Sequence, residues 1–332
     1  MSIKLLALAG VLFWNSVVHG QAYPEMQVAS VSVTDRAFVD ESRSNWNGDG
    51  PRRIGVTIWY PATIHMPTEI NEETRRGENR YPLIMISHGA QSQARDMHWL
   101  GDYLASRGYI AAAVNHNGSA EEERKLQHMT LSDFCMWVRP KDISVALDGI
   151  LRDSLFGWFV DTSRVGAAGF SLGGATAIWV AGARFDIHNL GRHAPKPPEH
   201  LEADIARFVA YTKTDPVVKR FMTHSGDDYH DPRIKAVFAL APAIGQGFTK
   251  KGLKSIHVPV QVAVGEEDII APMSTNAAHY TRSISTALPL IVLPGERGHY
   301  TRPSGDGNSH VRELEEVSEI AYDFFEGVFG KK

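Results

Sequence analysis

Apolar runs and amphipathic segments alternate along most of this chain. Continuous apolar runs are typical of strands buried on both faces of a sheet. One occurs at 82–86, and further largely apolar strands are predicted at 109–114, 163–168, 234–240, 257–264 and 289–293. Apolar positions at helical spacing predict helices at 95–107, 140–155, 175–183, 272–283 and 309–328. Because strands that alternate with helices over short connections form a parallel sheet covered on both faces, the pattern predicts an α/β fold.

The segments outside this alternation are of two kinds. Residues 26–34 and 54–60 alternate apolar and polar positions, which predicts two antiparallel strands, the first at an edge of the sheet. The polar stretches 41–53 and 62–80 are predicted to be loops, and 120–138 is predicted to be irregular.

An insertion at 184–232 interrupts the rhythm of strands and helices. Its apolar residues Leu201, Ile205 and Phe208 follow helical spacing. Asp215-Pro216 has the residue types of a helix N-cap and a first-turn proline. Because functional loops gather at the carboxyl edge of such a sheet, we expect the insertion to be a lid over that edge. A merely decorative insertion is the alternative.

Residues 1–20 have the features of a secretory signal peptide. Lys4 supplies the positive start, 5–14 is an apolar core, and small residues place the cleavage after Gly20 or Ala22. The apolar core is short for a bilayer span, so we expect no stable membrane span. The expectation is a secreted or periplasmic protein with one folded domain at 21–332. An uncleaved anchor is the alternative.

Composition narrows the classes of partner. The 332 residues carry a formal net charge of −4, which implies no basic face for a nucleic acid. A hydrophobic content of 43% allows a sizeable core. The single cysteine, Cys135, lies in an apolar stretch and cannot form an internal disulfide, so we expect a buried structural thiol.

The strongest chemical signal is Gly169-Phe170-Ser171-Leu172-Gly173-Gly174, between a predicted strand and a predicted helix. In that context, Gly-x-Ser-x-Gly presents a nucleophilic serine at a tight turn. Side chains two residues before and after the serine would collide there, which accounts for Gly169 and Gly173. The sequence therefore predicts that Ser171 is a nucleophile.

A serine hydroxyl needs an imidazole to accept its proton and a carboxylate to orient that imidazole. In a sheet of this kind, both come from loops at the carboxyl ends of later strands. Asp268 and His299 follow later predicted strands in the expected order, so we predict a Ser171–His299–Asp268 triad. The alternatives are a turn carboxylate at Asp268, with Glu267 as the reserve acid, and a surface-loop histidine at His299.

An acyl-transfer site also needs two donors for the oxyanion. We expect the N–H groups of Leu172, directly after the serine, and of Ala90, in the loop after the 82–86 strand. His88 and His116 also follow strands, and we expect them to fix their loops rather than to move protons.

Three side chains are predicted to line the substrate pocket: Phe170, Trp99 and Tyr300. Histidines also gather in two polar stretches, 188–200 and 224–231, without the regular spacing of a metal site. A solvated lid surface is the better interpretation of both stretches. We therefore expect neither a metal ion nor a cofactor.

Six segments occur in a telling order: Ser87-His88-Gly89, Asn115-His116, Arg139-Pro140-Lys141-Asp142-Ile143, Gly169-Phe170-Ser171-Leu172-Gly173-Gly174, Gly265-Glu266-Glu267-Asp268 and Gly298-His299. In this order they resemble predicted dienelactone hydrolases, which are α/β-hydrolases close to the plasma-type platelet-activating-factor acetylhydrolases. The resemblance covers most of 26–328. It implies an α/β-hydrolase fold and a metal-free serine carboxylic ester hydrolase with the triad Ser171, Asp268 and His299.

Two departures from these relatives matter. True dienelactone hydrolases use a cysteine nucleophile where this chain has Ser171. The acetylhydrolases place their acid one strand earlier, where this chain has Leu240-Ala241-Pro242. The second departure favours Asp268 as the acid and weakens the case for a phospholipid substrate.

Together these observations predict an exported enzyme that cleaves a small-molecule or lipid-like carboxylic ester through an acyl-enzyme. An amidase or peptidase with the same triad is the first alternative. A non-catalytic binding protein on a hydrolase fold is the second.

Overall fold

A computed structural model describes residues 30–64, 80–116, 126, 128–193, 199–295, 298–299 and 307–330. The predicted signal peptide at 1–20 and the predicted pocket residue Tyr300 lie outside the described residues. So does much of the predicted loop at 62–80.

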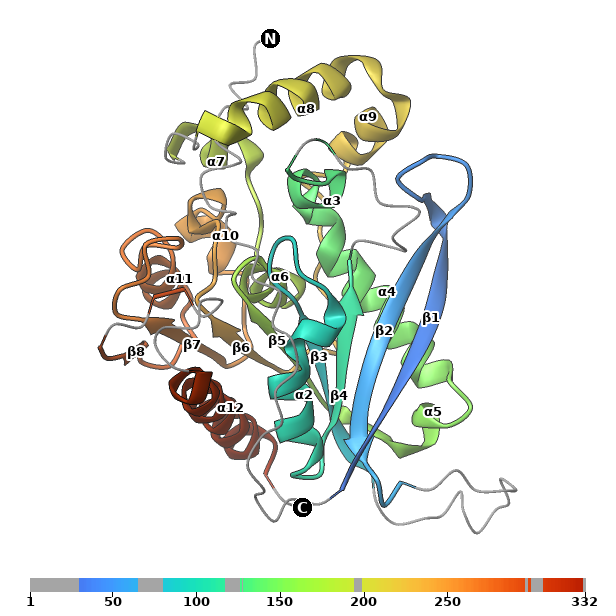
Figure 1. The fold of residues 1–332 in the computed structure, drawn as a ribbon, viewed down its shortest axis with the longest axis vertical. Helices are drawn as coiled ribbons and strands as arrows, with labels where there is room; N and C mark the ends of the chain where they lie inside the picture. Colours follow the sequence, from blue (N-terminus) through green and yellow to red (C-terminus); the bar gives the residue numbers. More distant parts are fainter. Residues whose placement is uncertain are drawn as a thin grey trace.

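The described strands form one eight-stranded sheet in the order β1-β2-β4-β3-β5-β6-β7-β8 (Figure 1). The strands are β1 Val31–Ser44, β2 Pro51–Pro61, β3 Tyr81–Ser87, β4 Ile110–Asn115, β5 Val160–Phe170, β6 Ala236–Leu240, β7 Val260–Gly265 and β8 Ile291–Leu293. Strand β2 runs antiparallel to both of its neighbours, and the strands from β4 to β8 pair in parallel. The predicted α/β fold is confirmed.

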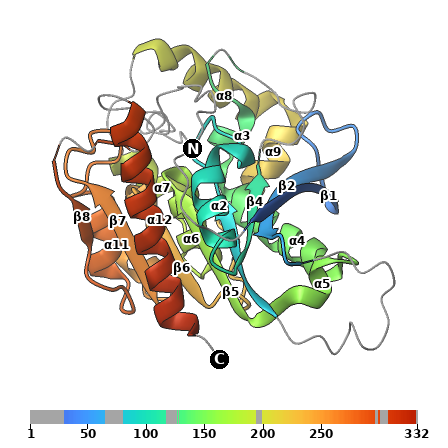
Figure 2. The ribbon, with the colours of Figure 1, turned by 60° about the horizontal axis from the view of Figure 1, so that its bottom comes forward.

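Helices cover both faces of this sheet. On one face, α2 (His98–Ala105) and α12 (Gly307–Phe329) lie side by side (Figure 2). On the other face, α4 (Arg139–Arg152) packs against α6 (Leu172–Val180). The central strand β3 is fully buried from Leu83 to Ile86, as its unbroken apolar run predicts. The shorter elements are η1 Ala94–Met97, α3 Leu131–Phe134, η2 Met136–Val138, α5 Phe156–Phe159, η4 Gly245–Gly247, α10 Lys250–Leu253 and α11 Ala277–Ser283.

The prediction of a loop at 41–53 is wrong at both ends. Strand β1 continues to Ser44 and β2 begins at Pro51, so only a short turn separates them. In that turn, the side-chain oxygen Oδ1 of Asn45 accepts hydrogen bonds from the backbone N–H groups of Asn47 and Gly48. Two of the polar residues that suggested a loop, Arg43 and Arg52, are paired with Asp142, which is distant in the sequence.

Other boundaries also differ from the predictions. The segment 120–138 contains the short helices α3 and η2 in its described part. The helix predicted at 140–155 ends at Arg152, where Asp153 takes an extended conformation and its carboxylate accepts from the N–H groups that start α5. The helix predicted at 272–283 begins only at Ala277. Polar side chains that bond to nearby backbone decide these boundaries, and hydrophobic spacing does not register them.

The insertion at 184–232 folds into α7 (Ile187–His193), η3 (Glu199–Leu201), α8 (Glu202–Thr214) and α9 (Pro216–Thr223). As predicted, the Asp215 carboxylate caps α9 by accepting from Val217 and Val218 N–H. In Figure 1, α8 and α9 lie beyond the end of the sheet at which β4 and the other parallel strands finish. Both helices pack against the rest of the domain. The Phe208 ring of α8 stacks on Phe134 with 4.6 Å between centroids, and the Phe221 ring of α9 lies 4.4 Å from the Trp46 ring, centroid to centroid.

Candidate active site

Strand β5 runs directly into α6 through Ser171, the only residue between the two elements. Ser171 has φ 55° and ψ −119°, a strained conformation for a residue with a side chain. A Cβ atom added to Gly169 would collide with the backbone of Gly173, and one added to Gly173 would collide with the backbone of Ser87. Glycine at both positions is therefore a steric requirement of the turn that presents the serine hydroxyl.

The structure brings together the three side chains predicted to form the triad. His299 Nε2 lies 2.8 Å from Ser171 Oγ, and His299 Nδ1 lies 2.8 Å from Asp268 Oδ2. The histidine follows β8 and the aspartate follows β7, so the sheet places them side by side. All three side chains are largely buried. A neutral imidazole in this row can accept the serine proton at Nε2 while its Nδ1–H donates to the carboxylate.

Asp268 is held in place by its own loop. Its Oδ1 atom accepts hydrogen bonds from Ile270 N–H at 3.0 Å and Ala271 N–H at 2.8 Å, which leaves Oδ2 directed at His299. The carboxylate thus has the features of a turn residue and of a histidine partner at once. Glu267, the reserve acid, is exposed.

Leu172 follows the serine in the chain, and Ala90 belongs to a loop that lies beside the serine. Leu172 is the first residue of α6, so its N–H has no acceptor within the helix. Ala90 follows Gly89, where an added Cβ would lie 3.7 Å from Ser171 Cβ and 3.2 Å from the Phe170 ring. The loop after β3 therefore lies beside the serine residue. The donor roles of Leu172 and Ala90 stay predictions.

The predicted pocket residues have different surroundings. The Phe170 ring packs against the His299 ring, with 4.9 Å between centroids, so Phe170 borders the Ser171–His299–Asp268 row. Trp99 lies on α2, and its carbonyl accepts from the Ser318 hydroxyl of α12 at 3.4 Å. That contact belongs to the α2–α12 packing, and a place for Trp99 in the pocket stays a prediction.

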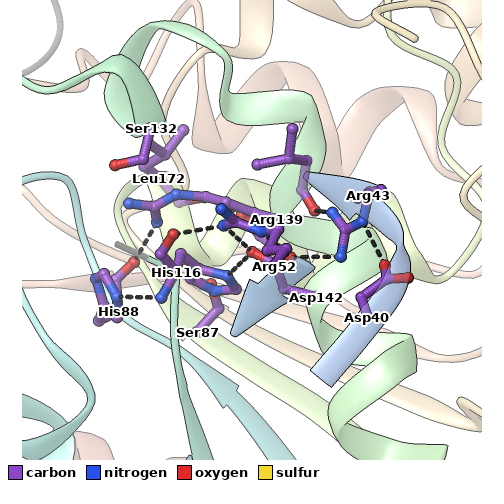
Figure 3. Close-up of polar contacts among 12 residues, drawn as sticks. Asp40, Arg43, Arg52, Ser87, His88, His116, Ser132, Arg139, Asp142 and Leu172 are labelled. Atoms are coloured by element: carbon purple, nitrogen blue, oxygen red, sulfur yellow. Dashed lines mark hydrogen bonds and ion pairs between the residues drawn. The ribbon is translucent and has the colours of Figure 1, made fainter. Parts of the chain in front are cut away.

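A buried network of charges lies behind the loop after β3 (Figure 3). At its centre, the Asp142 carboxylate accepts two hydrogen bonds of 2.8 Å from Arg52 and one of 2.7 Å from Arg43. It also accepts from His116 Nδ1 at 3.2 Å. Burial alone would raise the pKa of Asp142, but Arg52 and Arg43 hold that pKa well below its usual range. The carboxylate is therefore charged at neutral pH.

Both loop histidines belong to this network and stay neutral. His116 Nε2 lies 2.8 Å from Ser87 Oγ, and burial lowers the pKa of His116 to about 4. His88 Nδ1 donates to Gly89 O at 2.7 Å, and His88 Nε2 accepts from His116 N–H at 3.2 Å. Burial, reinforced by the charge of Arg139, lowers the pKa of His88 well below its ordinary value. These contacts hold the loop, as predicted from the sequence.

Two charged residues at this loop were missed by the sequence reasoning. Arg139 donates to His88 O at 2.8 Å and to Gly89 O at 3.3 Å, and Asp133 Oδ1 accepts from Gln91 N–H at 3.3 Å. The available signal was the Arg139-Pro140-Lys141-Asp142-Ile143 segment, which the resemblance singled out without a role. Nothing in the local pattern says that an arginine at the start of a helix reaches another loop.

Two other kinds of site are absent from the part of the chain that the structure describes. No group of three or more His, Cys, Asp and Glu side chains there is arranged to hold a metal ion. Within the same residues, no helix combines the length and the apolar character needed to cross a membrane. Cys135 is buried, and burial raises the pKa of its thiol far above the ordinary value, as expected of a structural cysteine.

The strand order, with a reversed second strand and a serine at the turn after β5, is that of an α/β-hydrolase. Comparison with known proteins narrows the class. A family model described as PET hydrolase-like matches residues 34–212, just over half of the chain. The chain therefore belongs to the PET hydrolase-like family.

Individual relatives are more distant. Cutinase est2 of Thermobifida alba is 28% identical over 164 residues, which are 49% of this chain and 44% of the cutinase. Cutinase 2 of Thermobifida cellulosilytica is 26% identical over 256 residues, 76% of this chain and 67% of the relative. Platelet-activating factor acetylhydrolase of Cavia porcellus is 25% identical over 250 residues, 57% of this chain and 56% of the relative. The match to est2 thus spans less than half of that cutinase. The match to the acetylhydrolase confirms the resemblance that the sequence motifs indicate.

Proposed function

We propose that this protein is a serine carboxylic ester hydrolase that acts through an acyl-enzyme. The observation that carries the proposal is the hydrogen-bonded row Ser171–His299–Asp268, with 2.8 Å at each step. Because both hydrogen bonds of the row are present, no further group is needed to activate the Ser171 hydroxyl. The relatives that are named cutinases and an acetylhydrolase support ester cleavage.

The reaction follows from the geometry in two halves. In the first, Ser171 Oγ attacks the ester carbonyl carbon while its proton passes to His299 Nε2, and the carbonyl oxygen becomes an oxyanion held by Leu172 and Ala90 N–H. The carbon–oxygen bond to the alcohol then breaks, and His299 returns the proton to the departing alkoxide. In the second half, water gives a proton to His299 and attacks the acyl-serine, which releases the acid and restores Ser171. Asp268 keeps the imidazole in the required tautomer throughout.

We further propose that the helices of 184–232 act as a cap that limits the size of the substrate. Support comes from their place beyond the carboxyl end of the sheet and from the stacking of Phe208 on Phe134. A panel of p-nitrophenyl esters with acyl chains of increasing length, together with a terephthalate ester, would measure the substrate range. A sharp fall in kcat/KM beyond one acyl length is the expected result, and an unchanged profile for Phe208→Ala, which removes the ring stacked on Phe134, would contradict a limiting cap.

The decisive test of the activity is Ser171→Ala. Loss of the nucleophile is expected to lower kcat for a short p-nitrophenyl ester by about 10⁵- to 10⁶-fold. Ser163→Ala is the matched control, because Ser163 is an exposed residue at the opposite end of the same strand. Full activity of the Ser171→Ala variant would refute the proposal. A matched pair of ester and amide substrates separates an esterase from an amidase with the same row.

Export is proposed on the sequence of residues 1–20. Expression of the full chain in a secreting host should yield a product that begins after Gly20 or Ala22, read by N-terminal sequencing. Recovery of the intact chain in the membrane fraction would favour the uncleaved anchor instead.

A further inference from the structure

The buried charges behind the loop after β3 take no part in the reaction derived above, although they touch a loop that does. Four of the residues drawn in Figure 3 are fully buried: Arg139, Asp142, His88 and His116. Burying charges costs free energy even when they are paired. The Nε atom of Arg139 is also buried without an acceptor among the described residues. An arginine kept only for stability would not carry that cost, so its position calls for another explanation.

The hydrogen bonds of this cluster converge on the residues on either side of Ala90. The Arg139 guanidinium donates to the carbonyls of His88 and Gly89, and the His88 ring also donates to Gly89 O. On the other side of Ala90, Gln91 N–H donates to Asp133 Oδ1. Strand β3 ends at Ser87, so these side chains replace the sheet pairing that the loop lacks. Gln91 has φ 54°, a left-handed conformation that a side chain disfavours and that the surrounding contacts must maintain.

Because the peptide bond is planar, the contacts of Gly89 O also set the direction of the Ala90 N–H. In a trans peptide, the C=O of Gly89 and the N–H of Ala90 point to opposite sides. Because Arg139 and His88 hold Gly89 O on their side, Ala90 N–H is turned to the other side of the loop. The serine residue lies next to this peptide, since an added Cβ at Gly89 would come within 3.7 Å of Ser171 Cβ.

We propose that Arg139 is a positioning residue that, with Asp133 and His88, presets the Gly89–Ala90 peptide as an oxyanion donor for the Ser171 reaction. The inference rests on the proposed function and adds to it the group that orients one of the two donors. A guanidinium suits this task because its planar fork donates to two successive carbonyls at once, which an ammonium does not do in fixed geometry.

The other residues of the cluster keep Arg139 charged and His88 neutral. Burial lowers the pKa of Arg139 to about 10, against the raising effect of Asp133 and Asp142, so the guanidinium stays protonated at neutral pH. Its separation from Asp133 is 4.0 Å. His88 accepts from His116 N–H at Nε2, and this fixes the tautomer whose Nδ1–H donates to Gly89 O. Arg43 contacts Asp40, Val138 and Asp142 but not the loop.

The test is Arg139→Lys, which keeps the positive charge and removes the fork, with Arg43→Lys as the matched control from the same cluster. Concentrations of active sites are first normalised by fluorophosphonate titration, and folding is checked by circular dichroism. For a short p-nitrophenyl ester, kcat of Arg139→Lys is expected to fall about 30- to 100-fold with KM within twofold, the pattern of a lost oxyanion donor. Arg43→Lys is expected to keep the wild-type kcat.

A second readout separates positioning from a general loosening of the fold. A trifluoromethyl ketone forms an oxyanion on the serine, so its inhibition constant should rise by the same factor as kcat falls, whereas KM should not change. If Arg139→Lys does not fold, Asp133→Asn carries the test, with an expected kcat loss of about 3- to 10-fold at unchanged KM.

The outcomes are distinguishable. If the wild-type protein neither hydrolyses esters nor reacts with the fluorophosphonate, the proposed function fails and the inference fails with it. If the wild type is active and a folded Arg139→Lys variant keeps kcat within threefold, the inference alone is overturned. A rise in KM that accounts for the whole loss of kcat/KM overturns it too.

Discussion

Replacement of Asp142 by asparagine removes the negative charge at the centre of the buried network and little else. The side chain keeps its shape and one carbonyl oxygen, but the other oxygen becomes an NH₂ group that faces donors. In the wild type, Asp142 accepts from Arg52 Nε and Nη2, Arg43 Nη2 and His116 Nδ1. Arg43 retains Asp40 as a partner, whereas Arg52 loses the only carboxylate among its described contacts. Asp142→Asn therefore leaves one buried arginine without its counter-charge.

The size of the effect follows from that arginine. Arg52 is 1% exposed, so solvent cannot replace the lost carboxylate. Removing one partner of a buried ion pair costs about 3–5 kcal/mol. A protein with a free energy of unfolding of about 5–15 kcal/mol would lose about a fifth or more of its stability. At about 2 °C per kcal/mol for a chain of this size, the midpoint of thermal unfolding is expected to fall by about 6–10 °C.

Urea unfolding followed by circular dichroism and tryptophan fluorescence measures the loss, provided that the two signals change together. Asp228→Asn is the matched control, since Asp228 pairs with Arg184 at the surface, where both side chains are about half exposed. That control is expected to cost about 0–1 kcal/mol. A loss below about 1 kcal/mol for Asp142→Asn, with an unchanged denaturant slope, would refute the view that this network is stabilised by its charge.

Two further predictions concern His116, which belongs to the same network, and the N-terminal cap of α9. Burial lowers the pKa of His116 to about 4, so the folded state binds fewer protons than the unfolded state between pH 6.5 and 4. The contribution of neutral His116 to the free energy of unfolding is therefore complete above pH 6.5 and is lost as the pH falls towards 4. It amounts to roughly 3 kcal/mol, and His116→Gln should flatten this acid limb in unfolding titrations; equal slopes for variant and wild type would count against it. Asp215→Ala removes the two cap bonds of α9 and should lower the free energy of unfolding by about 1 kcal/mol, with Asp227→Ala, an exposed residue outside the cap, as the control. No loss in Asp215→Ala would mean that the cap is replaced by solvent.

Much of the fold could be predicted because its central strands carry their own signal. Strand β3 is buried on both faces, so its run Leu83 to Ile86 has no polar interruption and is easily recognised. The alternation of strand and helix then leaves few topologies open. Segment 41–53 was mispredicted because Arg43 and Arg52 look solvent-exposed by residue type, and only their pairing with Asp142, some 90 residues away, explains their burial.

The candidate site, like the fold, could be predicted from the sequence only in part. Ser171 stands in a local motif, and Asp268 and His299 could be chosen because strands of a parallel sheet end at one edge. The support of the Gly89–Ala90 peptide could not be predicted, because it depends on the direction of the Arg139 side chain at the start of α4. Neither hydrophobic spacing nor residue type specifies which loop such a side chain reaches.

In the proposed mechanism, Ser171 is the activated nucleophile of a row with His299 and Asp268. Its most direct test is reaction of the full chain with a fluorophosphonate, followed by peptide mass spectrometry. We expect a single phosphonyl group on the peptide that contains Ser171, strong slowing of the reaction in His299→Asn, and no label in Ser171→Ala. A label on another residue, or full esterase activity in a protein whose Ser171 stays unlabelled, would contradict it.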